Sequence, residues 1–105
     1  MRKKRGISIN QFTLNNQTFS IRLTDHAALR LSQRKVDLFQ VTGAILSLGQ
    51  TRIISYQNSD RDVLIQDKVN GFAVVIVITG CIITIITIID SSDCWSKVGT
   101  DVVNI

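Results

Sequence analysis

Residues 72–89 (Phe-Ala-Val-Val-Ile-Val-Ile-Thr-Gly-Cys-Ile-Ile-Thr-Ile-Ile-Thr-Ile-Ile) decide the fold, because they lie within the longest uncharged stretch of the chain. Val, Ile and Thr dominate this stretch, and branching at Cβ favours the pleated sheet over the helix. Gly80 stands at its middle, and Asn70-Gly71 directly before it is a strong short-range hairpin signal. The stretch therefore predicts a buried hairpin at the centre of a sheet.

The same eighteen residues also reach the minimum length of a membrane-spanning helix. The β-branched composition and the central Gly80 favour the hairpin over that alternative. We therefore expect no membrane association. The hairpin strands are apolar on both faces, so either the segment around Trp95 or a second subunit must cover the face that the helices leave open. The second alternative predicts a homodimer.

The chain around the hairpin continues the strand pattern. The second half predicts four strands, at 52–57, 62–69, 72–78 and 82–89. Turn residues separate them at Asn58-Ser59-Asp60, Asn70-Gly71 and Thr79-Gly80. Strands that follow one another through such short turns pair antiparallel, so this half predicts an antiparallel β-meander of about four strands.

Two consecutive helices precede the meander. Thr24 can cap a helix that runs through Asp25 to about Arg34, with the Asp25 carboxylate at the positive end of the helix dipole. Asp37 and Gln40 have the spacing of a capping box, which predicts a second helix over about 38–48. Gly49 then suits the left-handed conformation that ends such a helix.

The first residues predict one more element, an opening β-hairpin. Residues 7–14 and 18–23 both alternate apolar with polar side chains, and Asn15 and Asn16 between them tolerate the dihedral angles of a tight turn. The predicted fold class is therefore α+β, with a β-hairpin and two consecutive helices packed on the meander. We divide the chain into a basic arm with the first hairpin strand (1–17), a single α+β domain (18–90) and a C-terminal tail (91–105).

Composition narrows the classes of function. The formal net charge of +4 comes from the basic run at residues 2–5, and basic and acidic residues balance in the rest. No apolar segment follows that run, so it is not part of a secretory signal, and we expect a cytoplasmic protein. Two cysteines thirteen residues apart and one histidine are too few for a zinc site. We expect reduced thiols, no metal and no cofactor.

One helix face carries residues suited to phosphodiester chemistry. His26, Arg30 and Arg34 are four residues apart, so they lie within an 80° arc of the first helix. An imidazole exchanges protons near neutral pH, and planar guanidinium groups bind phosphate and stabilise its growing charge. The alternative is a solvated helix face whose arginines form salt bridges and whose histidine is satisfied locally.

A family resemblance adds to this pattern. Residues 23–36, Leu-Thr-Asp-His-Ala-Ala-Leu-Arg-Leu-Ser-Gln-Arg-Lys-Val, resemble the signature Thr-x-His-Ala-x-x-Arg-Met-x-x-Arg-Gly-Ile of the bacterial domain-of-unknown-function family 4258. That family is similar to the BrnT and RelE-like ribonuclease toxins, in which helices pack on an antiparallel sheet. The resemblance covers about 18–90 and includes Ile-Thr-Ile at 83–85, where the family has Ile-Thr-Val-Tyr.

The resemblance implies site residues position by position. The matching positions are His26, Arg30, Arg34 and Thr84. Lys35 replaces the glycine that ends the family's helix, and Ile86 replaces its late tyrosine, for which Tyr56 is the candidate substitute. On a regular strand Thr84 shares a face with Ile86, and Thr87 points to the other face.

Two functions remain open from the sequence. The first is an RNA-binding, metal-independent ribonuclease of the toxin type, with His26, Arg30, Arg34 and Thr84 as catalytic residues and Arg30, Arg34 and Tyr56 as RNA contacts. Its expected partners are RNA and an antitoxin-like protein. The second is a non-catalytic module that binds nucleic acid or protein through the same helix face.

Overall fold

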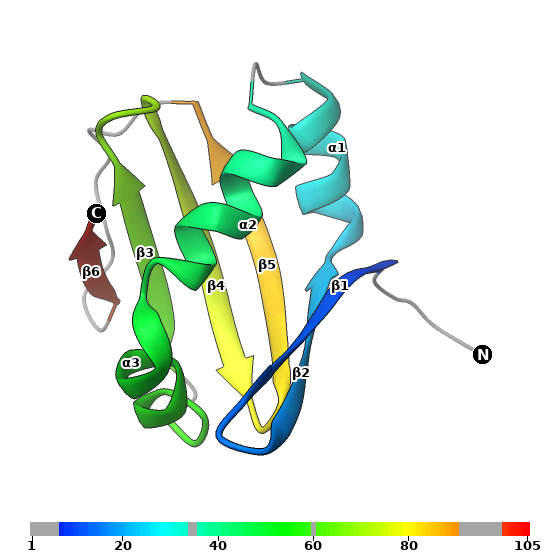
Figure 1. Cartoon of the computed structure of the whole chain (residues 1–105). Coiled ribbons are helices and arrows are strands. Elements are labelled where there is room, and N and C mark those ends of the chain that lie inside the picture. Colours follow the sequence, from blue (N-terminus) through cyan, green and yellow to red (C-terminus); the bar gives the residue numbers. More distant parts are fainter. Residues whose placement is uncertain (1–6, 34–35, 60, 91–99) are drawn as a thin grey trace.

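Within the part of the chain that the structure describes, six strands form one mixed sheet in the order β1-β2-β5-β4-β3-β6 (Figure 1). The computed structural model describes residues 7–33, 36–59, 61–90 and 100–105. In chain order the elements are β1 (Ile7–Leu14), β2 (Gln17–Leu23), α1 (Asp25–Gln33), α2 (Leu38–Leu46), α3 (Gly49–Ser55), β3 (Asp62–Asp67), β4 (Phe72–Thr79), β5 (Ile82–Ile89) and β6 (Asp101–Asn104).

The central hairpin is confirmed. β4 and β5 pair antiparallel across a tight turn in which Gly80 has a φ of 60°. β3 joins β4 through the turn that contains Gly71, with a φ of 75°. These left-handed dihedral angles cost glycine nothing, because it has no Cβ atom. Residues 72–89 are thus two strands, and within the described ranges no helix is long and apolar enough to cross a membrane.

The α+β class is confirmed, but a four-strand antiparallel meander with two helices is wrong. Only β3, β4 and β5 form the meander, and a parallel strand flanks it on each side. β2 pairs parallel with β5, from Ser20 with Ile82 to Leu23 with Ile85. β6 pairs parallel with β3. Both pairings join segments far apart in the sequence, so no local pattern reports them.

Residues 52–57 belong to a helical region and not to the predicted strand. α3 starts at Gly49. The left-handed φ of 85° at this residue separates α3 from the helical turn that follows α2. This arrangement buries Ile53 in the same core as Leu48 from the preceding turn. Burial under the helical layer outweighs the local strand preference of the two adjacent isoleucines at 53 and 54, because propensity is weaker than tertiary packing.

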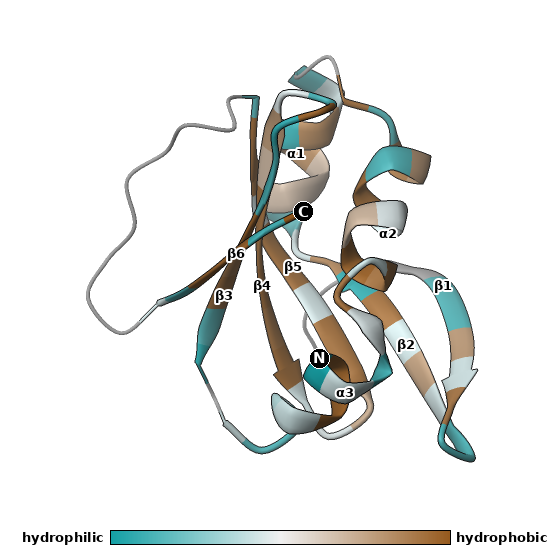
Figure 2. Ribbon diagram, turned by 60° about the vertical axis from the view of Figure 1, so that its left-hand side comes forward, coloured by the Kyte–Doolittle hydropathy of each residue, from teal (hydrophilic) through white to brown (hydrophobic). Residues whose placement is uncertain are grey.

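The core lies between one face of the sheet and the helices (Figure 2). Alternate strand residues face this core, such as Phe19 and Ile21 on β2 and Ile76 and Ile78 on β4. The other sheet face, which we call the outer face, carries the residues between them. α2 adds Val41 to the core, behind a complete capping box. The predicted start of this helix is therefore confirmed.

Both ends of the described chain contribute to this one sheet. β1 pairs with β2 through a turn in which Asn15 and Asn16 both have positive φ, so the predicted hairpin is confirmed. β6, from the segment assigned to a tail, is the opposite edge strand. Residues 91–99, including Cys94 and Trp95, lie outside the described residues. The sheet thus extends beyond 18–90 in both directions.

Two glycines provide a matched test of the helical layer. Gly49 has a left-handed φ of 85°, whereas Gly43 lies inside α2 with open space where a Cβ would stand. We expect Gly49→Ala to lower the free energy of unfolding by about 1–2 kcal/mol, because an L-residue is strained there. Gly43→Ala should raise it by about 0.5–1 kcal/mol.

Urea denaturation of the two variants measures both changes. Equal effects of the two substitutions would contradict the helix junction at Gly49.

Candidate functional site

Thr24 anchors the start of α1 to the sheet. Its backbone N–H donates to the Ile85 carbonyl over 3.2 Å, and its hydroxyl donates to the Ile86 carbonyl over 3.1 Å. The same hydroxyl accepts from the Ala27 backbone N–H over 3.0 Å, which is the predicted helix cap. One side chain therefore fixes the first turn of α1 at the point on β5 where β2 ends.

β5 is irregular at this point. Its register with β4 shifts so that Ile76 pairs with Ile85 and Val75 pairs with Thr87, which makes Ile86 an extra residue. Thr84 pairs with Val77. Val75 and Val77 are two residues apart and share one face of β4, so both threonines lie on the outer face. The expectation that Thr87 points away from the Thr84 face is wrong, because it assumed a regular strand.

His26 contacts the second of these threonines. Its Nε2 atom lies 3.1 Å from the Thr87 Oγ1 atom, and the histidine itself is exposed. The tautomer decides which of the two groups donates the hydrogen bond. In both cases the bond orients the imidazole, so a solvent-accessible ring is held beside the outer face of the sheet.

The structure describes one of the two arginines that the sequence predicts on the first helix. Arg30 is half-buried and lies one helical turn after His26. Arg34, like Lys35, lies outside the described residues.

A third arginine, which the sequence did not place in the site, lies on β2, the strand that pairs with β5. Arg22 is exposed and pairs with Thr84 across β2 and β5. Because Ile21 and Leu23 beside it are buried, its side chain lies on the outer face. The alternation of β2 predicts that Arg22 faces away from the core, but only the parallel pairing with β5 brings it beside Thr84. We call Arg22, His26, Arg30, Thr84 and Thr87 the His26 surface.

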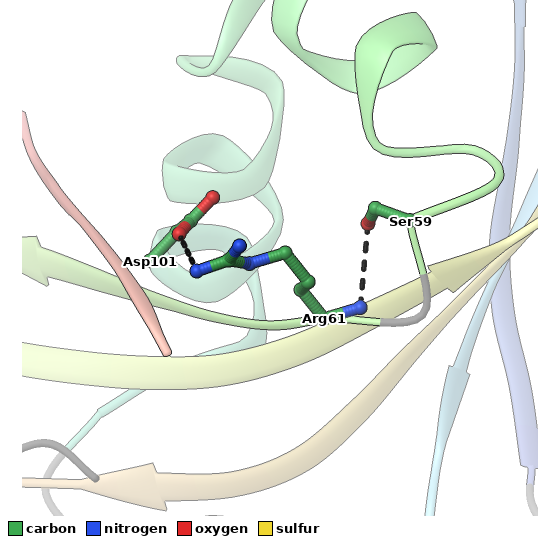
Figure 3. Close-up of polar contacts among 3 residues, drawn as sticks. All are labelled: Ser59, Arg61 and Asp101. Carbon is green, nitrogen blue, oxygen red and sulfur yellow. Dashed lines mark hydrogen bonds and ion pairs between the residues drawn. The ribbon is translucent and has the colours of Figure 1, made fainter. Parts of the chain in front are cut away.

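Tyr56, the predicted RNA contact, lies apart from the His26 surface, near the edge strand β6. It follows α3, and its hydroxyl hydrogen bonds to the Asp101 carboxylate. Figure 3 shows that carboxylate in an ion pair with Arg61, with 2.7 Å between Nη2 and Oδ1. Asp101, on β6, is three strands from β5, a separation of about 14 Å. The structure therefore does not bring Tyr56 to the His26 surface.

The Tyr56 cluster instead connects the helical layer to the edge strand. Burial raises the pKa of the Tyr56 hydroxyl, and the hydrogen bond to Asp101 and the charge of that carboxylate raise it further. Arg52 and Arg61 partly oppose this shift. Ser59 accepts a hydrogen bond from the Arg61 backbone N–H over 3.3 Å, also drawn in Figure 3. These contacts hold β6 against β3.

The Cys81 thiol and the Asp67 carboxylate each have structural partners. The Cys81 thiol donates to the Gln17 side-chain oxygen over 3.3 Å, and Gln57 donates to that same oxygen over 2.9 Å. Asp67, which is buried, accepts from the backbone and side chain of Asn70. Within the described residues, no three or more His, Cys, Asp or Glu side chains form a group that could hold a metal ion.

Comparison with known proteins leaves the family open. The chain matches no family model, no curated protein and no solved structure. The resemblance to family 4258 and to the ribonuclease toxins therefore stays a prediction from residues 23–36 and 83–85.

The anchoring role of Thr24 is open to a stability measurement. Thr24→Val keeps the side-chain volume but removes both the cap to Ala27 and the donor to the Ile86 carbonyl. We expect the free energy of unfolding to fall by about 1–2 kcal/mol. Thr18→Val, at an exposed position of β2, is the control and should change it by less than about 0.5 kcal/mol. Indistinguishable unfolding curves for the two variants would rule out the anchor.

The raised pKa of Tyr56 predicts that the free energy of unfolding changes with pH in the alkaline range. Because the pKa of Tyr56 is raised in the folded protein, there is a pH range in which its hydroxyl is protonated in the folded state and ionised in the unfolded state. This contribution to stability is complete below the ordinary tyrosine pKa and is lost as the pH rises through the folded value. We therefore expect the unfolding free energy to fall above about pH 10.

Ultraviolet absorbance of tyrosinate measures the Tyr56 pKa directly, because the chain has a single tyrosine. Asp101→Ala should lower that pKa, since it removes an acceptor and a negative charge. Asp25→Asn, at an exposed position of α1, should leave it unchanged. An unshifted titration in Asp101→Ala would mean that burial alone sets the pKa.

Proposed function

We propose that the chain binds RNA on the His26 surface and that His26 cleaves the bound strand without a metal ion. The observation that carries this proposal is the 3.1 Å contact between His26 Nε2 and Thr87 Oγ1. It holds the only imidazole of the chain, exposed and oriented, on the sheet face that also carries Arg22 and Thr84.

The charges of this surface support phosphate as the group that is bound. Arg22 comes from β2 and Arg30 from α1, so two separate elements each contribute a cation to the His26 surface. A guanidinium binds phosphate oxygens through two parallel hydrogen bonds, which positions as well as attracts the phosphate. The threonine hydroxyls at 84 and 87 add neutral donors on the same face. The two arginines and the two threonines could together contact consecutive phosphates of a single RNA strand.

The proposed reaction uses the 2′-hydroxyl group of RNA. His26 takes the proton of that hydroxyl, and the 2′-oxygen attacks the adjacent phosphorus. The bond from phosphorus to the 5′-oxygen breaks, and that oxygen takes a proton from the imidazolium or from water. Arg22 and Arg30 stabilise the added negative charge of the transition state. The products are a 2′,3′-cyclic phosphate and a free 5′-hydroxyl group.

A second function is favoured by a different observation. Tyr56, the candidate for the late tyrosine of the ribonuclease toxins, is bonded to Asp101 and is remote from the His26 surface. Ile86, which stands at the matching position, cannot donate a proton. A module that binds RNA without cleaving it needs the arginines and the threonines, but it needs no tyrosine hydroxyl at the His26 surface.

One experiment separates the two functions. Purified protein is incubated with a fluorescent single-stranded RNA in chelator, and both binding and cleavage are followed. We expect His26→Ala to reduce cleavage by about 100-fold or more while binding changes little. Arg22→Gln should weaken binding and reduce its dependence on salt, with the logarithmic slope falling by about 0.7 for each lost phosphate contact. Arg52→Gln, at an exposed position of α3, is the matched control.

The outcomes are distinct. A 2′,3′-cyclic phosphate product that disappears in His26→Ala and on RNA with 2′-deoxyribose supports the ribonuclease. Tight, salt-dependent binding without product supports the non-catalytic module. Equal binding by wild type, Arg22→Gln and Arg52→Gln would exclude the His26 surface from both functions.

A further inference from the structure

β1 is an edge strand that lacks the usual protection against pairing. It spans eight residues at one margin of the sheet. Residues 7–20 contain no charged side chain, and the chain contains no proline. Natural edge strands commonly carry lysine or proline that blocks the approach of another strand. The shift of register between Ser8 and Asn10 disturbs only the start of β1, so Asn10 to Leu14 remains regular.

The backbone of β1 presents hydrogen-bonding groups at this margin that pair with no other strand of the described residues. Gln11 pairs with Ser20, whose N–H donates over 2.8 Å to the carbonyl of Cys81, the residue before β5, and so points away from β1. Gln11 and Ser20 are therefore a pair without mutual hydrogen bonds, and the Gln11 N–H points outward. It donates to its neighbouring Asn10 Oδ1 atom over 2.8 Å. By the same alternation, the N–H and C=O groups of Thr13 also point outward.

An apolar surface lies beside the same margin. A groove of about 280 Å³ lies between β1 and α2, lined by Asn10, Leu38, Phe39 and Thr42. Phe39 is 89% exposed, an unusual state for a phenyl ring. Residues 38–51 contain no charged side chain. The edge and the groove therefore form one neutral surface, whose parts come from β1 and α2.

We propose that this surface binds a second copy of the chain, through antiparallel pairing of β1 with β1 of the partner. Two copies related by a two-fold axis perpendicular to the sheet keep their helices on the same side. Each Phe39 ring then lies beside the new strand pair, next to the groove of its own copy. An axis through Phe12 pairs Gln11 with Thr13 of the partner subunit, so the outward N–H and C=O groups of both residues are satisfied.

The absence of charge favours a second copy as the occupant. A neutral surface meets its own copy without like-charge repulsion, whereas a charged partner would gain no complementary contact from it. The two phenyl rings together can bury about 300–500 Å², against the roughly 1,200 Å² of the smaller stable interfaces. The paired strands and the groove walls must supply the rest. We therefore expect a dimer whose formation depends on protein concentration.

Sedimentation equilibrium over roughly 1–500 μM protein tests the dimer. The expected mass rises with concentration from 11.7 kDa to twice that value. Amide hydrogen exchange at Thr13 should slow over the same range. A mass of 11.7 kDa at every concentration would overturn the proposal.

Charge placed on the edge tests the strand pairing. Gln11 and Thr13 are exposed in one copy, so charged side chains there leave the fold intact. Gln11→Lys with Thr13→Lys sets like charges opposite each other and should abolish the dimer. Gln11→Lys with Thr13→Glu sets opposite charges across the seam and should restore it. Equal dimerisation of the two double variants would overturn the pairing.

Phe39 tests the helical half of the surface. Phe39→Ser should weaken dimerisation at least tenfold without loss of stability, because the ring is exposed in one copy. Val102→Ser is the control, since Val102 is a partly exposed apolar residue on the opposite edge strand. A dimer that is lost in Val102→Ser and kept in Phe39→Ser would place the interface at β6 and overturn the proposal.

Discussion

The parallel pairing of β2 with β5 is the contact on which the rest of the structure depends. It joins the first hairpin to the last strand of the meander and so closes the layer on which the helices pack. It also fixes where α1 begins, because Thr24 follows β2 and bonds to β5 at once. The two strands are far apart in the sequence, so their pairing closes a long loop, and the packing of the core must offset the entropy that this closure costs.

The same pairing assembles the candidate site. β2 brings Arg22 beside Thr84, and the end of β2 leaves a place on β5 where α1 approaches. There the extra residue Ile86 turns Thr87 toward the outer face, within reach of His26. The functional groups thus stand on rigid elements, which hold side chains more precisely than loops do. The proposed catalysis and the proposed pairing of β1 are separate hypotheses, because the first depends on His26 and the second on the free edge of β1.

Features with a local physical cause could be predicted. The capping box of Asp37 and Gln40, the Thr24 cap and the turn at Asn15-Asn16 each depend on residues within four positions of one another. Within the candidate site, the sequence indicated His26, Arg30 and Thr84 as individual positions. It did not indicate Arg22 or Thr87, because their roles depend on a neighbouring strand and on a bulge. The helix at Gly49–Ser55 was missed since its two isoleucines prefer strands until the core takes Ile53.

The sequence by itself determined the α+β class, the central hairpin and the start of each of the first two helices. Hydrophobic periodicity and turn chemistry act over a few residues, so they can be recognised without knowledge of the fold. Only the tertiary structure decided the strand order, the parallel partners of β5 and β3, and the separation of Tyr56 from His26. These depend on which apolar faces meet when the core closes, and many segments of this chain offer equally apolar faces.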